Sequence, residues 1–133
     1  MTWQSIRLEL DRTRDFPNGS AGRAYLLRLP LCEDGAVDPA AILESPGRAT
    51  MRRFWPNEPD ISGHVGLVGG CWALLSDAPS SRCWVISELA REPFREGSLL
   101  RISEHGGEAL PFRVARCAPC HHHRRRVGGS EGR

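Results

Sequence analysis

The stretch HVGLVGGCWALLS, residues 64–76, decides the fold class of this chain. Two apolar runs flank Gly69-Gly70, and a glycine pair between such runs is typical of a two-residue β-hairpin turn. Glycines after an apolar run can also form a phosphate-binding loop, but that loop must lead into a helix whose N-terminus holds the phosphate. Here a second strand-like run follows, so the pattern favours a hairpin.

Strand-like segments lie on both sides of this hairpin in the sequence, and in them apolar and polar residues alternate with a period of two. SIRLEL at residues 5–10 and RAYLLRLPL at residues 23–31 place apolar side chains on one face, which indicates half-buried strands. SLLRIS and ALPFRVA flank EHGGE at residues 104–108, which is a second hairpin signal. The apolar residues that share a face within these segments are Ile6, Leu8, Leu10, Tyr25, Leu27, Leu29, Leu110, Phe112 and Val114.

One segment, VDPAAILES at residues 37–45, predicts a helix. Asp38 is a good N-cap, Pro39 suits the first helical position, and Pro46-Gly47 ends the segment after about two turns. The whole pattern predicts a mainly β fold. We expect a small antiparallel barrel or sandwich of about seven or eight short strands, with one short helix near residues 38–45.

The charge of the chain is concentrated at its C-terminal end. All 18 basic residues are arginine, which excludes chemistry that needs a lysine amine. Residues 1–116 hold 14 arginines and 15 acidic residues, a net charge of −1, whereas residues 117–133 hold four arginines and one acid, a net charge of +3. The first part lacks the positive surplus of a nucleic-acid-binding domain, so nucleic acid is not favoured as a partner.

The C-terminal sequence CAPCHHHRRR, residues 117–126, contains two cysteines at metal-ligand spacing followed by three histidines. The pattern fits covalent haem attachment, but that reaction requires export. It fits a zinc site better, although the pattern itself does not specify the fourth ligand. Strand-like periodicity stops after Ala115, however. We therefore predict a single β-rich domain at residues 1–116 and a disordered basic tail at residues 117–133, with a zinc site as the alternative.

The five cysteines show no disulfide framework, and the N-terminus has no apolar run typical of a signal peptide. These features predict reduced thiols and a cytoplasmic location. Cys71 and Cys83, each followed by a tryptophan in a strand-like segment, are predicted to be small buried hydrophobic residues. No apolar run reaches the length of about 18 residues that a membrane-spanning helix requires, so no membrane partner is expected.

The segment RRFWPNEPDISGH, residues 52–64, is the strongest candidate for a binding surface. In a strand, Arg52 would share a face with Phe54 and Arg53 with Trp55, and arginine stacked on an aromatic ring recurs at base and phosphate contacts. The alternative is structural, with the arginines paired to acids of the following loop. The candidate binding residues are Arg52, Arg53, Phe54, Trp55, Glu58, Asp60 and His64.

Acid–base catalysis by Glu58, Asp60 and His64 is a weaker hypothesis, because no spacing or motif holds these groups together with a nucleophile. We therefore expect no catalytic residue, no cofactor and no resident metal. The leading prediction is a non-catalytic module that binds an unknown protein or a small-molecule ligand. The alternatives are a zinc protein using the C-terminal cluster, or a small enzyme or nucleic-acid binder using residues 52–64. Edge strands also allow a homodimer formed by strand pairing.

Several segments together carry a resemblance to a known group of proteins. They are IRLELDRTRDFPNGS, LRLPLCEDGAVD, RRFWPNEPDISG, the hairpin with its glycine pair and tryptophan, and FREGSLLRISEHGGEALPFRV. Over residues 5–115 the chain resembles a family of short, uncharacterised, β-rich proteins of proteobacteria, chiefly alphaproteobacteria. The resemblance implies one globular domain of bacterial cytoplasmic origin. It implies no catalytic residue, because the family has no established activity.

Overall fold

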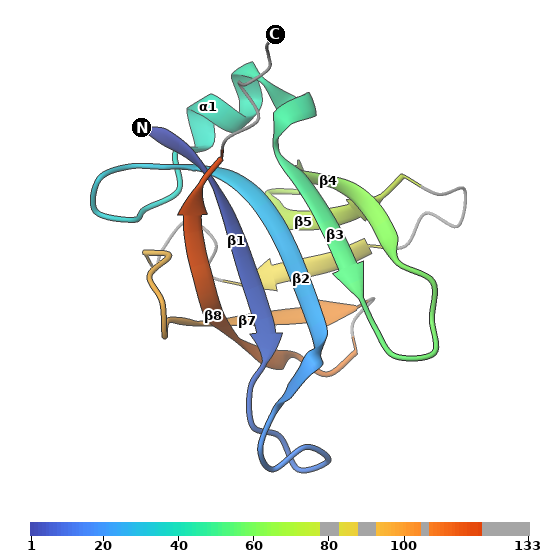
Figure 1. Ribbon diagram of the computed structural model, residues 1–133. Helices are drawn as coiled ribbons and strands as arrows, with labels where there is room; N and C mark the ends of the chain where they lie inside the picture. The colour runs from blue at the N-terminus through green and yellow to red at the C-terminus, as the bar shows by residue number, and fades with distance from the viewer. Residues whose placement is uncertain (78–82, 88–92, 105–106, 121–133) are drawn as a thin grey trace, which may run out of the picture.

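The computed structural model describes residues 1–77, 83–87, 93–104 and 107–120, and its strands form one closed antiparallel barrel (Figure 1). Each strand pairs with the next along the chain, and the first pairs with the last. The mainly β prediction is confirmed, in the form of a barrel. The strands are β1 (Thr2–Leu10), β2 (Ser20–Leu31), β3 (Thr50–Phe54), β4 (Ile61–Val68), β5 (Cys71–Ser76), β6 (Cys83–Ser87), β7 (Leu99–Glu104) and β8 (Leu110–Pro119).

The pairing of β1 with β8 closes the barrel and joins the two ends of the described chain. Its register runs from Gln4 opposite Pro119 to Leu10 opposite Phe112. In the described residues each strand therefore has a hydrogen-bonded neighbour on both sides. This closure uses the free sheet edges on which the expected homodimer depended, and the homodimer itself stays a prediction.

Strand β8 continues beyond the domain boundary that the sequence suggested at Arg116. Cys117 pairs with Ile6 of β1, and the backbone N–H of Cys120 donates to the carbonyl oxygen of Trp3 at 3.0 Å. The alternation of apolar residues fades here, but the backbone pairing does not. The first residues of the expected tail thus belong to the barrel. Residues 121–133 lie outside the described part, so disorder there stays a prediction.

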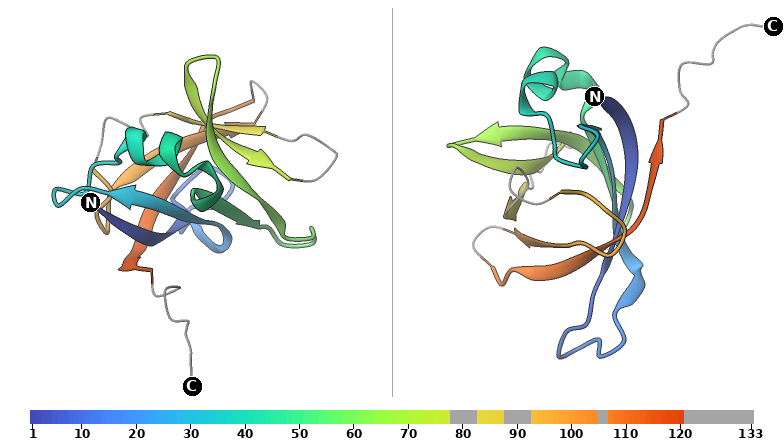
Figure 2. Two further views of the ribbon diagram at one scale, coloured as in Figure 1. Left: turned by 90° about the horizontal axis from the view of Figure 1, so that it is seen from above. Right: turned by 90° about the vertical axis from the view of Figure 1, so that its left-hand side faces the viewer.

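The glycine pair between β4 and β5 forms the expected hairpin turn. Gly69 and Gly70 have φ angles of 56° and 82°, and a turn with two positive φ angles matches the twist of the flanking strands. Figure 2 shows this hairpin extending away from the barrel. Cys71 directly follows the turn at the tip of this hairpin and is exposed. Cys83, the first residue of β6, is only half-buried. The prediction that both cysteines are buried is therefore wrong.

The interior of the barrel contains the apolar residues that the alternation placed on one face. Ile6, Leu8, Leu27 and Leu29 have no exposed surface, and Leu10 is 2% exposed. One end of the barrel is bordered by the loops that join β1 to β2 and β3 to β4, and we call it the loop end (Figure 1). The core changes from aliphatic to aromatic side chains toward this end. The aromatic core residues there are Tyr25, Trp84 and Phe112.

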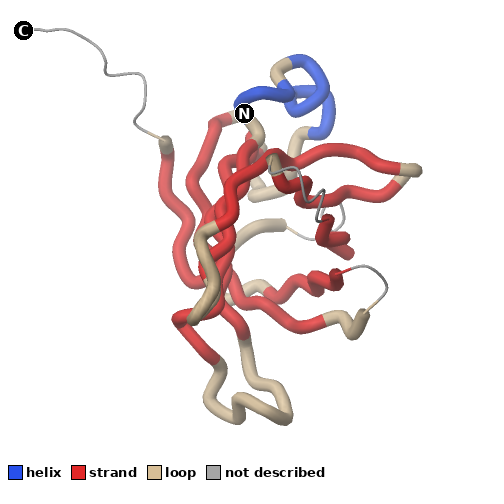
Figure 3. The backbone as a smooth tube through the Cα atoms, turned by 90° about the vertical axis from the view of Figure 1, so that its right-hand side faces the viewer, coloured by secondary structure: helices blue, strands red, loops and turns tan. Residues whose placement is uncertain are grey.

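One end of the barrel is covered by the predicted helix, α1 (Pro39–Glu44), and by a following 3₁₀ turn, η1 (Pro46–Arg48) (Figures 2 and 3). The carboxylate of Asp38 accepts a hydrogen bond from the backbone N–H of Ala41 at 3.3 Å, as the N-cap prediction requires. Ala41 and Ile42 are buried against the core. The opposite end of the barrel is bordered by loops. No helix in the described residues combines the length and the apolar character needed to cross a membrane.

Candidate functional site

The two consecutive arginines of β3 lie on opposite faces of the barrel wall. Arg53 lies directly opposite Tyr25 of β2 and is only 4% exposed. Arg52 faces outward, and 53% of its side chain is exposed. The prediction that the two arginines lie on different faces of the strand is confirmed, since consecutive residues of a strand point to opposite sides.

The outward-facing arginine makes the contacts of a surface residue. The guanidinium carbon of Arg52 lies 5.2 Å from the centre of the Phe54 ring, as the shared face predicted. One of its terminal nitrogens lies 3.4 Å from the carboxylate of Asp60, whose side chain is half exposed. Exposed pairs of this kind contribute little to stability. Arg52, Phe54 and Asp60 therefore form a solvated cluster outside the barrel.

The inward-facing arginine makes the equivalent contacts in a buried setting. Nη1 of Arg53 donates to the Glu58 carboxylate at 2.8 Å, and the guanidinium carbon lies 4.0 Å from the centre of the Trp55 ring. Asn57, with a φ angle of 64°, turns the chain after the strand, and the N–H of Glu58 donates to the carbonyl of Trp55 at 3.2 Å. This turn returns Glu58 to the arginine that precedes it by five residues.

The pairing of Arg53 is incomplete. Its Nε is the only buried side-chain nitrogen or oxygen among the described residues that has no hydrogen-bond partner. A buried donor without an acceptor costs about 1–3 kcal/mol. A second indole, that of Trp84, lies 5.2 Å from the guanidinium carbon. The barrel thus holds a cation between two tryptophans with one donor still to be satisfied.

Arg53 lines a pocket of about 460 Å³ at the loop end of the barrel, which we call the aromatic chamber. The ring of Tyr25 meets Trp55, Trp84 and Phe112 edge-on, with ring centres 6.4, 6.5 and 5.1 Å apart. Such contacts hold aromatic walls in fixed orientations. The other lining residues are Ile102, Gly107, Glu108 and Leu110. Because Gly107 and Glu108 are exposed, they form the rim of this chamber.

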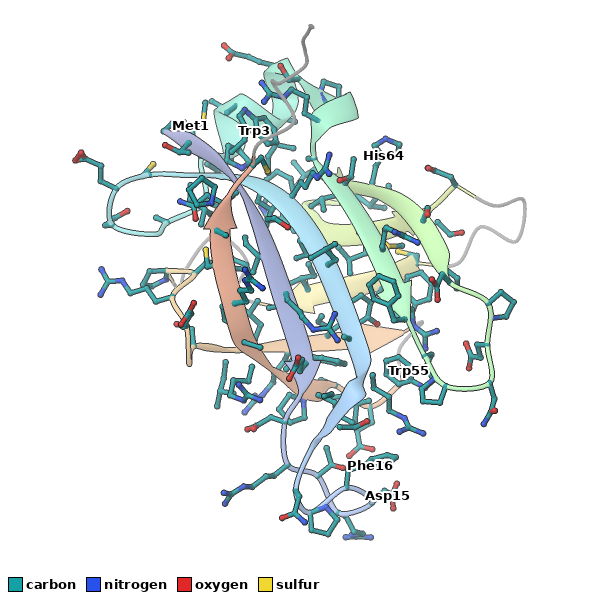
Figure 4. The ribbon with its side chains drawn as sticks, in the orientation of Figure 1. Met1, Trp3, Asp15, Phe16, Trp55 and His64 are labelled. Carbon is teal, nitrogen blue, oxygen red and sulfur yellow. The ribbon has the colours of Figure 1, made fainter. Side chains whose placement is uncertain are left out.

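A second pocket of about 490 Å³ adjoins the aromatic chamber and shares Trp55, Glu108 and Leu110 with it. It is formed largely by the loop between β1 and β2, and Figure 4 shows Phe16 and Asp15 of this loop below Trp55. We call it the outer groove. Its charged residues are Arg12, Arg14, Asp15, Arg23 and Glu108.

The loop that forms the outer groove is ordered by its own hydrogen bonds. The N–H of Phe16 donates to Oγ1 of Thr13, and the N–H of Thr13 donates to the carbonyl of Phe16, both at 3.0 Å. The guanidinium carbon of Arg23 lies 4.1 Å from the centre of the Phe16 ring and 5.8 Å from that of Trp55. The sequence alone predicts no role for the segment of residues 11–19. Its one available signal was the mixture of arginines with an aromatic residue.

His64 does not belong to this end of the barrel. Its Nδ1 lies 2.9 Å from the carboxylate of Asp77, and Figure 4 shows it at the opposite end from Trp55. Glu58 and Asp60 pair with the two arginines instead. The structure therefore does not bring together the three groups considered for acid–base catalysis. It brings Arg53, Trp55 and Glu58 together, and places the other candidate residues elsewhere.

The cysteines near the C-terminus make contacts within the protein. The thiol of Cys117 donates to the amide oxygen of Gln4 at 3.0 Å. Burial raises the pKa of the Cys117 thiol, and the carboxylate of Glu96 adds to this effect. Burial also raises the pKa of the Cys120 thiol, whereas nearby arginines oppose the change. Thiolates, not thiols, bind metals. The described residues contain no group of three metal ligands, and residues 121–123 lie outside them, so the zinc alternative stays a prediction.

Comparisons of the chain with models of known protein families, with curated proteins and with solved structures give no match. The resemblance to uncharacterised proteobacterial proteins therefore stays a prediction.

Proposed function

We propose that this protein is a non-catalytic binding module that holds one small organic ligand in the loop end of its barrel. The observation that carries the proposal is Arg53, a buried cation that lines the aromatic chamber and has an unpartnered Nε. An acceptor atom of a ligand would satisfy this donor. Buried polar groups in native proteins nearly always have such a partner.

The dimensions of the barrel support this proposal. A closed barrel of eight strands has an interior that side chains can fill, or that can hold one small ligand. In this protein the end covered by α1 is closed by buried residues such as Val37 and Ile42, whereas the loop end has a pocket of about 460 Å³. Small-molecule sites are of this size, and they combine apolar walls with a few polar groups.

The chemistry of the lining favours binding over catalysis. The described residues of the aromatic chamber include one carboxylate, Glu108, one cation, Arg53, and one hydroxyl, Tyr25. A catalytic site needs a nucleophile or base with an orienting partner in reach. The aromatic and aliphatic residues that make up the rest of the lining supply contact area and shape.

The proposal is tested with 1-anilinonaphthalene-8-sulfonate, an aromatic dye that fluoresces in apolar sites. We expect saturable binding with one dye per chain. Leu110→Trp fills the chamber and should weaken binding at least about tenfold, or 1.4 kcal/mol. Leu99→Trp is the matched control, because Leu99 is 51% exposed on the neighbouring strand, and it should leave binding unchanged. No saturable binding, or equal binding by both variants, would refute the proposal.

A further inference from the structure

The inner end of the aromatic chamber has a hydrogen-bond donor to satisfy, but little charge. Arg53 is already paired with the Glu58 carboxylate at 2.8 Å, so the two formal charges cancel. The side chain of Glu58 is 39% exposed, so it neutralises Arg53 from the side that solvent reaches. A ligand carboxylate at Arg53 would be repelled by the Glu58 carboxylate beside it. A neutral acceptor, such as a ring nitrogen or a ring carbonyl oxygen, would satisfy the Nε without adding charge. The inner end therefore suits an uncharged acceptor.

The walls of the chamber suit a flat ring. Tyr25, Trp55, Trp84 and Phe112 all line it, and the guanidinium of Arg53 lies over both indoles. Planar rings gain from stacking on aromatic faces and on guanidinium planes. A flat ring carrying an acceptor on its edge would fill the space and reach Arg53.

The outer groove is different, because it has a surplus of positive charge. Its lining contains three arginines and two acids, a net charge of +1. Arg23 is held by the Phe16 ring and by a hydrogen bond from Nη1 to Oγ of Ser20 at 3.2 Å. Arg12 and Arg14 are exposed, and no ion pair involves them among the described residues. Arginines grouped in this way suit a phosphate or another oxyanion.

We infer that the ligand is a nucleoside monophosphate or a close chemical equivalent, with its heterocycle in the aromatic chamber and its phosphate in the outer groove. This inference rests on the proposed function. The two pockets adjoin at Trp55, Glu108 and Leu110, which line both, so a ligand that extends past these residues would contact both pockets. A guanine ring fits best, since its O6 and N7 atoms form the acceptor edge that arginine recognises most often.

The inference is tested by calorimetry with guanosine 5′-monophosphate, guanosine and inorganic phosphate, each also used to displace the dye. We expect the nucleotide to bind at least about tenfold more tightly than guanosine, which is 1.4 kcal/mol. Phosphate alone should not displace the dye. The affinity of the nucleotide should fall with added salt, and that of guanosine should not.

Three arginine substitutions separate the two ends of the site. Arg23→Met should reduce the affinity of the nucleotide to that of guanosine and leave guanosine unaffected. Arg53→Lys keeps a charge opposite Glu58 but removes the guanidinium donors. It should reduce the affinities for the nucleotide and for guanosine by the same factor. Arg52→Met is the matched control, since Arg52 has the same contacts on the outer face, and it should change neither affinity.

Each remaining outcome overturns a stated part of the inference. One such outcome is saturable dye binding that neither the nucleotide nor guanosine displaces at up to about 10 mM, which means a binding free energy weaker than about 2.7 kcal/mol. This outcome would remove the ligand class and leave the proposed function standing. Equal affinity for nucleotide and guanosine would remove the role of the outer groove. Full affinity in Arg53→Lys would remove the role assigned to Arg53. If the unsubstituted protein does not bind the dye saturably, the proposed function itself is contradicted.

Discussion

Gly63 gives the most direct test of the barrel geometry. A Cβ atom at this position would lie 1.8 Å from the carbonyl oxygen of Leu75, on the neighbouring strand β5, and 3.1 Å from Cε of Met51. The first contact is about 1.2 Å shorter than the 3.0 Å below which real Cβ contacts essentially never occur. Because the blocking atom belongs to the backbone, no change of side-chain rotamer can relieve the clash in Gly63→Ala.

The expected loss of stability follows from the movement that this clash demands. Shifting β5 by about 1.2 Å would lengthen the hydrogen bond from the N–H of Asp77 to the carbonyl of Ser62, now 2.9 Å, to roughly 4 Å, beyond hydrogen-bond distance. Overpacking costs about 1–3 kcal/mol. Ser62 and Asp77 are exposed, so the lost hydrogen bond adds only about 0.5–1.5 kcal/mol. We expect Gly63→Ala to lower the free energy of unfolding by about 2–4 kcal/mol, a large share of a typical total of about 5–15 kcal/mol.

The assay is urea denaturation followed by circular dichroism, with Gly66→Ala as the matched control on the same strand. The Cβ atom of that variant would lie 3.3 Å from Cδ1 of Leu75, the far end of a flexible side chain. We expect its stability to stay within about 1 kcal/mol of the parent protein. If the two variants unfold at the same urea concentration, the close approach of β4 and β5 at Gly63 is wrong.

Two further predictions concern the helix cap and the cysteines. Asp38→Ala removes the acceptor of the Ala41 N–H and should lower the free energy of unfolding by about 1 kcal/mol. Glu44→Ala, at the exposed C-terminal end of α1, should leave it unchanged. Equal effects of the two substitutions in urea denaturation would contradict the cap. In pulse alkylation with iodoacetamide at pH 8, read by peptide mass spectrometry, the exposed Cys32 and Cys71 should react before Cys117, whose thiol pKa is raised by burial. The order should vanish in urea, and early labelling of Cys117 in the folded protein would count against its place in β8.

Much of the fold could be predicted because local patterns and tertiary contacts agree. The glycine pair specifies a turn with positive φ angles, the Asp38-Pro39 pair specifies a helix start, and the alternation in β1 and β2 matches the buried face. Barrel closure is different, since it depends on the pairing of β1 with β8 across more than a hundred residues of sequence. No local pattern encodes which strand meets which, and β8 continues to Pro119 only because β1 offers it a partner.

The candidate site shows the same limit at the level of single residues. Strand alternation predicted that Arg52 and Arg53 would face opposite sides, and that each would stack on the aromatic residue two positions later. It could not decide which side is inside, because both faces of β3 carry an arginine and an aromatic. The decision comes from Tyr25, which lies opposite Arg53 and belongs to the buried face of β2.

This symmetry of the two arginines has a functional consequence. The two guanidinium groups have the same kinds of partner, an aromatic ring and a carboxylate, so local contacts do not distinguish them. Burial does, because solvent reaches the free donors of Arg52, whereas the Nε of Arg53 has no acceptor among the residues that the structure describes. An ion pair inside a barrel is weak evidence for stability, since desolvation offsets much of its attraction. An unsatisfied donor within that pair, beside a pocket, is instead the feature that a bound ligand would explain.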